Sequence, residues 1–152
     1  VYMDALDQFV KHRLRAKRYL RYVDDFVLVH HDRAQLAQWQ AQIEAFLHDT
    51  LKLSLKPDIR LARLSDGIDF LGYVVRPTHT LVRRRVVTHA TAALSAWETA
   101  HVRGGRLHAS RRHRRQIAAV LASYGGHFQH ANSYRLRQRL RRRFPWITEL
   151  EA

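Results

Sequence analysis

One stretch decides the fold of the first part of the chain: Arg18-Tyr19-Leu20-Arg21-Tyr22-Val23-Asp24-Asp25-Phe26-Val27-Leu28-Val29-His30. Aromatic and β-branched residues stand on both sides of the two adjacent acids, as is typical of strands that form a pleated, buried surface. Two residues between two such runs predict a tight β-hairpin with Asp24 and Asp25 at its turn.

The two acids can be interpreted in two ways. Asp tolerates the backbone angles of turns, so Asp24 and Asp25 could simply be turn residues. However, their like charges repel each other, and no Gly or Asn is present to ease the turn. A divalent cation between the carboxylates and a substrate phosphate would make the pair favourable, and Mg²⁺ prefers such a mixed set of ligands. The residues alone leave both interpretations open.

Two motifs carry a resemblance to a known family. Tyr22-Val23-Asp24-Asp25 resembles the Tyr-x-Asp-Asp catalytic hairpin of reverse transcriptases. Further along, Phe70-Leu71-Gly72-Tyr73 is similar to a segment that follows this hairpin in bacterial reverse transcriptases of group II introns and diversity-generating retroelements. The order and separation of the two motifs also agree with that family. The resemblance implies an RNA-directed DNA polymerase, which is a metal-dependent nucleotidyltransferase.

The resemblance also implies roles for individual residues. Asp24 and Asp25 are expected to bind two Mg²⁺ ions, for which Mn²⁺ could substitute, and Tyr22 and Val23 are expected near the nucleotide and the primer end. Lys56 is the candidate for neutralising the leaving pyrophosphate, although the residues alone favour an ordinary charge on a strand edge for both Lys52 and Lys56. The expected primer grip consists of Phe70, Leu71, Gly72 and Tyr73.

The remaining patterns predict an α+β fold. They indicate helices over residues 1–12 and 33–49, the second capped by Asp32 and anchored in the core by Trp39. Strands are predicted over 51–56, 59–64, 68–75 and 81–87, and three helices follow from residue 88. Ser110 is expected to cap the second of these helices and Gly125-Gly126 to end it, and Phe144-Pro145-Trp146 is expected to end the third. In the terms of the resembling family, residues 1–87 are the C-terminal part of a polymerase palm, built of antiparallel β-hairpins with packed helices, and residues 88–152 are a helical thumb.

Charge is distributed very unevenly along the chain. Its 27 Lys and Arg outnumber 13 Asp and Glu, which gives a net charge of +14. Residues 103–143 contain twelve Arg and no acid. Arginine in the first turn of a helix opposes the helix dipole, so phosphate contacts explain these residues better than helix stability does. The alternative is a basic surface that is merely solvated. The residues expected to bind nucleic acid are Arg111, Arg112, Arg114, Arg115, Arg135, Arg137, Arg139 and Arg142.

The composition excludes some kinds of binding site and favours one cellular location. The absence of Cys excludes disulfides and thiolate zinc sites and favours a cytoplasmic location, and no apolar run approaches the length of a membrane span. The histidine pairs at 30–31 and 127–130 are interpreted as strand-end and surface residues rather than metal ligands. The expected partners are an RNA template, a DNA or RNA primer and a dNTP, and an accessory protein is left open.

A polymerase site of this kind needs another carboxylate from a neighbouring strand. Only 23 residues precede Asp24, and Asp4 and Asp7 fall in a predicted helix, where they are expected to be solvated. We therefore expect the chain to be the C-terminal palm and thumb of a longer enzyme and to be inactive alone. Two alternatives are a truncated or degenerate relative that only binds RNA or DNA, and a metal-dependent nuclease, for which no motif is present.

Overall fold

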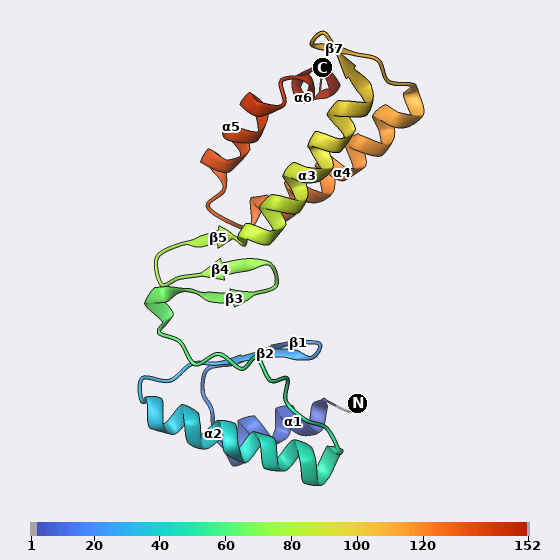
Figure 1. The fold of residues 1–152 in the computed structure, drawn as a ribbon. Helices are drawn as coiled ribbons and strands as arrows, with labels where there is room; N and C mark the ends of the chain where they lie inside the picture. Colours follow the sequence, from blue (N-terminus) through green and yellow to red (C-terminus); the bar gives the residue numbers. More distant parts are fainter. Residues whose placement is uncertain (1–2, 152) are drawn as a thin grey trace. The chain divides into compact units, whose positions relative to one another are not determined.

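The computed structural model describes residues 3–151, which form two compact units that divide between Leu61 and Ala62. Both units combine helices with small antiparallel sheets (Figure 1), so the α+β class is confirmed. The division into a palm up to residue 87 and a thumb from residue 88 concerns function and stays a prediction. By its contacts, the predicted grip segment belongs with the helices that follow it.

The first unit packs two helical segments against one hairpin. Its elements are α1 (Asp4–Gln8), continued by the π-helical turns η1 (Phe9–Arg13), the strands β1 (Tyr19–Tyr22) and β2 (Asp25–Leu28), and α2 (Arg33–Phe46), continued by η2 (Leu47–Leu51). Both predicted helices are confirmed over the described residues. The predicted cap is confirmed as well, because the Asp32 carboxylate accepts a hydrogen bond of 2.8 Å from the Ala34 amide.

The hairpin is confirmed, but its turn lies one residue earlier than predicted. Tyr22 pairs with Asp25, so Val23 and Asp24 form the two-residue loop and Asp25 begins the second strand. Side-chain alternation explains this register. It places Tyr19, Arg21, Phe26 and Leu28 on the face toward the helices, whereas a slip by one residue would turn Asp25 toward the core.

The core of the first unit lies between that hairpin face and the helices. Leu6 and Val10 of the first helical segment are fully buried against Ile43 and Leu47 of the second, and Trp39 is 8% exposed. Tyr19, Phe26 and Leu28 pack against this cluster from the hairpin. Trp39 is therefore a core residue, as predicted.

Two predicted strands are wrong. Residues 52–63 form neither strand nor helix, and only a short 3₁₀ turn, η3 (Leu64–Asp66), follows them. Lys52 adopts a left-handed conformation that ends η2, and the Leu53 amide donates back to the Leu47 carbonyl. Among the described residues, the alternating pattern of 51–56 has no partner strand, and without a partner a ladder cannot form.

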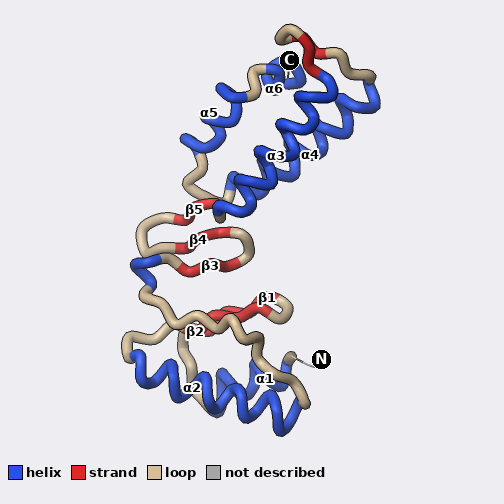
Figure 2. The backbone as a smooth tube through the Cα atoms, viewed as in Figure 1, coloured by secondary structure: helices blue, strands red, loops and turns tan. Residues whose placement is uncertain are grey.

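The second unit joins a three-stranded sheet to a group of helices (Figure 2). Its strands are β3 (Ile68–Phe70), β4 (Tyr73–Val75) and β5 (Thr80–Val82), and α3 (Arg84–His101) follows them. The small hairpin of β6 (Val102–Arg103) and β7 (Arg106–Leu107) leads into α4 (Arg111–Gln129), α5 (Tyr134–Arg143) and α6 (Trp146–Glu151).

Four expectations for the second unit are corrected. The run 68–75 is not one strand, because the chain reverses at Leu71 and Gly72 and β3 pairs with β4. The run 81–87 leaves the sheet after Val82, and α3 begins at Arg84. Gly125 and Gly126 do not end α4, because its helical hydrogen bonding continues to Gln129. Phe144-Pro145 does end α5, as predicted, but Trp146 is not part of this break, because it begins another short helix.

The helices of the second unit share one core. Leu94 of α3, Ile117 of α4, and Phe144, Trp146 and Ile147 around α6 form a buried cluster. Ser110 caps α4, as predicted, by accepting a hydrogen bond from the His113 amide. Asn132 exchanges two hydrogen bonds with the backbone of Thr80, so the start of α5 is held at the edge of the sheet.

Gly72 allows a close approach between the β3–β4 turn and α4. It has a φ of +84°, and a Cβ at this position would lie 2.9 Å from Cε1 of His127. We expect Gly72→Ala to lower the free energy of unfolding of the second unit by about 2–4 kcal/mol, from left-handed strain plus a steric clash. Urea unfolding followed through the indole NMR signals of Trp97 and Trp146 measures the loss.

The matched control is Gly104→Ala. Gly104 also has positive φ, at +56°, but no atom lies within 4 Å of its Cβ position. This variant should show only the conformational cost of about 1–2 kcal/mol. Equal losses in the two variants would mean that the contact with His127 contributes nothing to stability.

Candidate functional site

The tip of the β1–β2 hairpin presents the two predicted carboxylates to solvent. Asp24 lies in the loop and Asp25 at the start of β2, and their side chains are 66% and 59% exposed. The neighbouring residues Tyr22 and Val23 are exposed to a similar degree. All four residues predicted from the Tyr-x-Asp-Asp motif are therefore open to a ligand from outside the hairpin.

Lys56 contacts both carboxylates. Its ammonium group is 3.1 Å from Oδ2 of Asp24 and 3.6 Å from Oδ1 of Asp25. The residue comes from the irregular segment after η2 and not from the predicted strand, so the interpretation as a strand-edge charge is wrong. One cation thus bridges two acids that would otherwise repel each other.

This arrangement changes the proton affinity of the groups involved. The hydrogen bond from Lys56 holds the pKa of the Asp24 carboxyl below its ordinary value. In return, Asp24 first and Asp25 second raise the pKa of the Lys56 ammonium. Near neutral pH the pair therefore consists of a charged Asp24 carboxylate and a charged Lys56 ammonium, and exposure to water keeps their interaction weak.

The loop that carries Asp24 has a strained backbone. Val23 has a φ of +55°, a region that β-branched side chains rarely adopt. Such a residue costs about 1–3 kcal/mol and persists only where surrounding contacts hold it. The turn is therefore maintained by interactions other than the conformational preference of Val23.

Sequence reasoning missed a second polar cluster directly beneath this turn. The Arg21 guanidinium binds the Asp7 carboxylate through two nitrogens, with Nε 2.7 Å from Oδ1. The Tyr19 hydroxyl donates to the same Oδ1 at 2.7 Å. The prediction that Asp7 is a solvated helix residue is therefore wrong, because its carboxylate binds two residues of the hairpin. Arg21 and Tyr19 are alternate residues of one strand, which was the only signal in the sequence for their shared face.

The environment of Asp7 is much more enclosed than that of the candidate metal site. The side chains of Asp7 and Arg21 are only 18% and 22% exposed. The bond to Arg21 is the main cause that lowers the pKa of Asp7 to about 2, and the bond from Tyr19 and the charge of Lys11 act in the same direction. Asp7 is therefore ionised near neutral pH.

The predicted primer-grip residues form the tip of the β3–β4 hairpin. Leu71 and Gly72 both have positive φ, as a two-residue type I′ turn requires, and Leu71 is 41% exposed. The Tyr73 ring stacks on His127, with centroids 4.3 Å apart, and its hydroxyl donates to the His127 carbonyl at 2.9 Å. His127 is therefore a packing residue rather than the surface histidine that was expected.

The predicted nucleic-acid-binding arginines lie on two helices of the second unit. All eight are exposed. Arg135, Arg139 and Arg142 are spaced to share one face of α5, while Leu140 of the same helix packs into the core. The exposed surface of α5 is thus almost entirely cationic. Helix α5 also carries Arg137. Helix α4 carries the other four predicted residues, which are Arg111, Arg112, Arg114 and Arg115.

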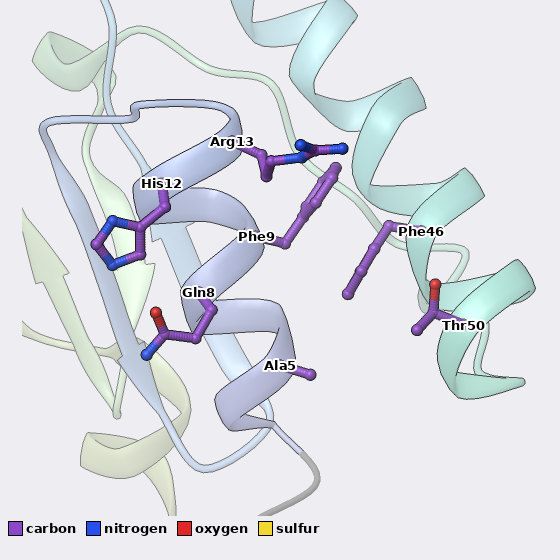
Figure 3. A pocket seen from close by; sticks show the side chains of 7 residues that line it. All are labelled: Ala5, Gln8, Phe9, His12, Arg13, Phe46 and Thr50. Carbon is purple, nitrogen blue, oxygen red and sulfur yellow. The ribbon is translucent and has the colours of Figure 1, made fainter.

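One groove in the first unit contains none of the predicted site residues. It has a volume of about 660 Å³ and lies between the first helical segment and α2, where the rings of Phe9 and Phe46 stack at 4.2 Å (Figure 3). Its lining is completed by Ala5, Gln8, His12, Arg13 and Thr50. None of these described lining residues is acidic, so they offer no carboxylate to a metal ion.

Other observations bear on metals and membranes. Across residues 3–151, no group of three or more His, Cys, Asp or Glu side chains could hold a metal ion, so Asp24 and Asp25 would have to share an ion with ligands from elsewhere. Every helix in that range is too short or too polar to cross a bilayer. No protein-family model matches the chain, and no curated protein matches it significantly.

Proposed function

We propose that this chain is the C-terminal palm and thumb of a bacterial reverse transcriptase, an RNA-directed DNA polymerase of the group II intron or diversity-generating retroelement kind. The observation that carries the proposal is the cluster at the hairpin tip. There, two adjacent, exposed carboxylates of a Tyr-x-Asp-Asp motif converge on a single cationic group, Lys56.

The donor set fits magnesium. Mg²⁺ is commonly held by one or two carboxylates together with water and substrate phosphates. Asp24 and Asp25 supply two carboxylates, and their exposure leaves room for water and phosphate. The ammonium of Lys56 stands in the position of a cation between them. Asp24 would be the main ligand and Asp25 a second or supporting one.

The proposed reaction is transfer of a nucleotide to a primer. Bound magnesium would supply stabilisation of the attacking 3′-oxygen and of the leaving oxygen at the α-phosphate. In this chain, Asp24 and Asp25 hold negative charge at the site. Lys56 would move from the carboxylates to the departing pyrophosphate and neutralise it. Tyr22, exposed beside the acids, would contact the primer end.

The arginine-rich helices support the same proposal from the second unit. Guanidinium groups bind phosphate through planar, paired donors. With no acid among residues 103–143, nothing in that segment neutralises them. They would hold the template–primer duplex by its backbone, independently of sequence. Because a further strand-borne carboxylate is needed, we expect the 152-residue chain alone to bind metal and nucleic acid but not to extend a primer.

Binding of Mn²⁺ by the isolated chain tests the site. We expect Mn²⁺ to broaden the NMR signals of residues 23–26, and Asp24→Ala to abolish the effect. Lys56→Gln should strengthen Mn²⁺ binding about five- to tenfold, because it removes a positive charge that lies beside both carboxylates and competes with the metal for them.

Lys52→Gln is the matched control, since Lys52 is an exposed lysine of the same segment that forms no ion pair with Asp24 or Asp25. It should leave the affinity unchanged. Broadening that survives Asp24→Ala would contradict the proposed site, and equal effects of the two lysine variants would show that only overall charge matters. A chain that binds RNA but no metal would favour the alternative of a pure binding module.

A further inference from the structure

Arg21 connects the hairpin turn to the first helix. Two of its nitrogens bind the Asp7 carboxylate on α1, and the third, Nη1, donates to the Val23 carbonyl at 2.6 Å. All three nitrogens belong to one rigid plane. Arg21 therefore fixes the position of the Val23 carbonyl relative to α1, because the same guanidinium group binds Asp7.

Asp7 is itself fixed from a second direction. The Tyr19 hydroxyl donates to Asp7 at 2.7 Å, and Tyr19 packs against the buried cluster of the unit. Arg21 and Asp7 are both largely shielded from solvent, whereas the two acids at the tip are mostly exposed. A rigid, shielded cluster thus lies directly below an exposed, strained turn.

The strain in the turn needs such a support. Val23 has positive φ, and its carbonyl is the group that Arg21 holds. If this carbonyl were released, Val23 could relax to negative φ, and the adjacent Asp24 would change direction. Lysine at position 21 would keep the charge but could not bind Asp7 and Val23 in the same way, because it lacks the planar fork.

We infer that Asp7, Tyr19 and Arg21 are positioning residues that hold the Val23–Asp24 turn in its metal-binding conformation. The inference rests on the proposed function, since it takes Asp24 to be a metal ligand. None of the three residues touches the metal position; they act through the backbone of Val23.

The test compares variants of the 152-residue chain by NMR, with MnCl₂ as the probe. Positive φ at Val23 gives an intense NOE cross-peak between the amide and Hα protons of this residue. Titration with Mn²⁺ measures the affinity of the site at Asp24 for the metal. We expect Arg21→Lys to lose the cross-peak and to weaken Mn²⁺ binding about three- to tenfold. Arg18→Lys, at an exposed arginine three residues earlier, should change neither.

Repeating the Arg21→Lys comparison in a Val23→Asn variant distinguishes support of the turn from a general loss of structure. Asn adopts positive φ far more readily than Val, so Val23→Asn should make the support unnecessary. In that background, Arg21→Lys should weaken Mn²⁺ binding less than about twofold. An equal loss in both backgrounds, or no loss in either, would overturn the inference. Where Arg21→Lys perturbs the Trp39 indole signal, Asp7→Asn replaces it, with the same expected results.

The two readouts separate this inference from the proposed function. If the unmodified chain shows no Mn²⁺ binding at Asp24, the proposed metal site is wrong. The Val23 cross-peak then still decides the support of the turn: its loss in Arg21→Lys upholds that support, and its persistence contradicts it.

Discussion

Asp24→Asn is expected to lower RNA-templated DNA synthesis by at least about 10³-fold when the chain is part of the longer polymerase that we propose. The amide keeps the size of the side chain but removes the negative charge that would hold the metal. Metal-ion stabilisation of the transferring phosphoryl group contributes several kcal/mol, and each 1.36 kcal/mol changes the rate tenfold. Steady-state incorporation of dNTP on an RNA template with a DNA primer measures the loss.

The matched control is Asp58→Asn. Asp58 is an exposed acid two residues after Lys56, and it has no place in the proposed site. Its replacement changes the net charge equally and should leave the rate within about twofold. Template affinity, measured separately without dNTP, should be unaffected by either variant. Synthesis by Asp24→Asn within tenfold of the unmodified enzyme would exclude Asp24 as the principal metal ligand.

Binding of an RNA–DNA duplex is expected to weaken by about 10³ to 10⁵ between 50 and 200 mM salt, if six to ten of the predicted arginines contact phosphates. Each neutralised phosphate contributes about 0.9 to the slope of log affinity against log salt concentration. Replacing Arg135, Arg139 and Arg142 with Gln should therefore reduce that slope by about 2.7. Fluorescence anisotropy of a labelled duplex at a series of salt concentrations measures it.

A second triple variant controls for overall charge. Arg13, Arg33 and Arg63 are exposed arginines outside α4 and α5. Replacing them with Gln also takes the net charge from +14 to +11, but the slope should change by less than about 1. Equal changes in the two triple variants would mean that the arginines of α5 form a solvated surface without specific phosphate contacts.

The parts of the fold that could be predicted from the sequence are those with a strong local pattern. Helical periodicity predicted α2 with its Asp32 cap, and aromatic and β-branched runs predicted the hairpin. The turn of the hairpin lies one residue earlier than predicted, because the two acids between the apolar runs have the pattern of a two-residue loop. The alternation of Tyr19 and Arg21 toward the helices decides the register, and that alternation depends on which face is covered.

The failures concern segments whose structure depends on distant partners. The run 68–75 is apolar apart from Asp69 and Gly72, and its single glycine did not by itself show that the chain reverses at Leu71 and Gly72. Residues 51–56 alternate as a strand does but have no partner among the described residues. Val86 and Val87 favoured a strand, yet they lie in α3, where tertiary packing overrides their β preference.

The candidate site shows the same division. The motif predicted Asp24 and Asp25, the family resemblance added Lys56 as a candidate, and the structure brings all three together. The motif could not identify Asp7, because a helical Asp with no obvious partner looks solvated. Only the fold brings it to Arg21, 14 residues away in the sequence.

The most direct test of the account is DNA synthesis by the complete reading frame that encodes this chain. With an RNA template, a primer, the four dNTPs and Mg²⁺, we predict a DNA product whose sequence is complementary to the template and which is absent when Mg²⁺ is removed. A purified complete protein that binds the template–primer duplex but makes no such product would contradict the proposal that this chain belongs to a reverse transcriptase.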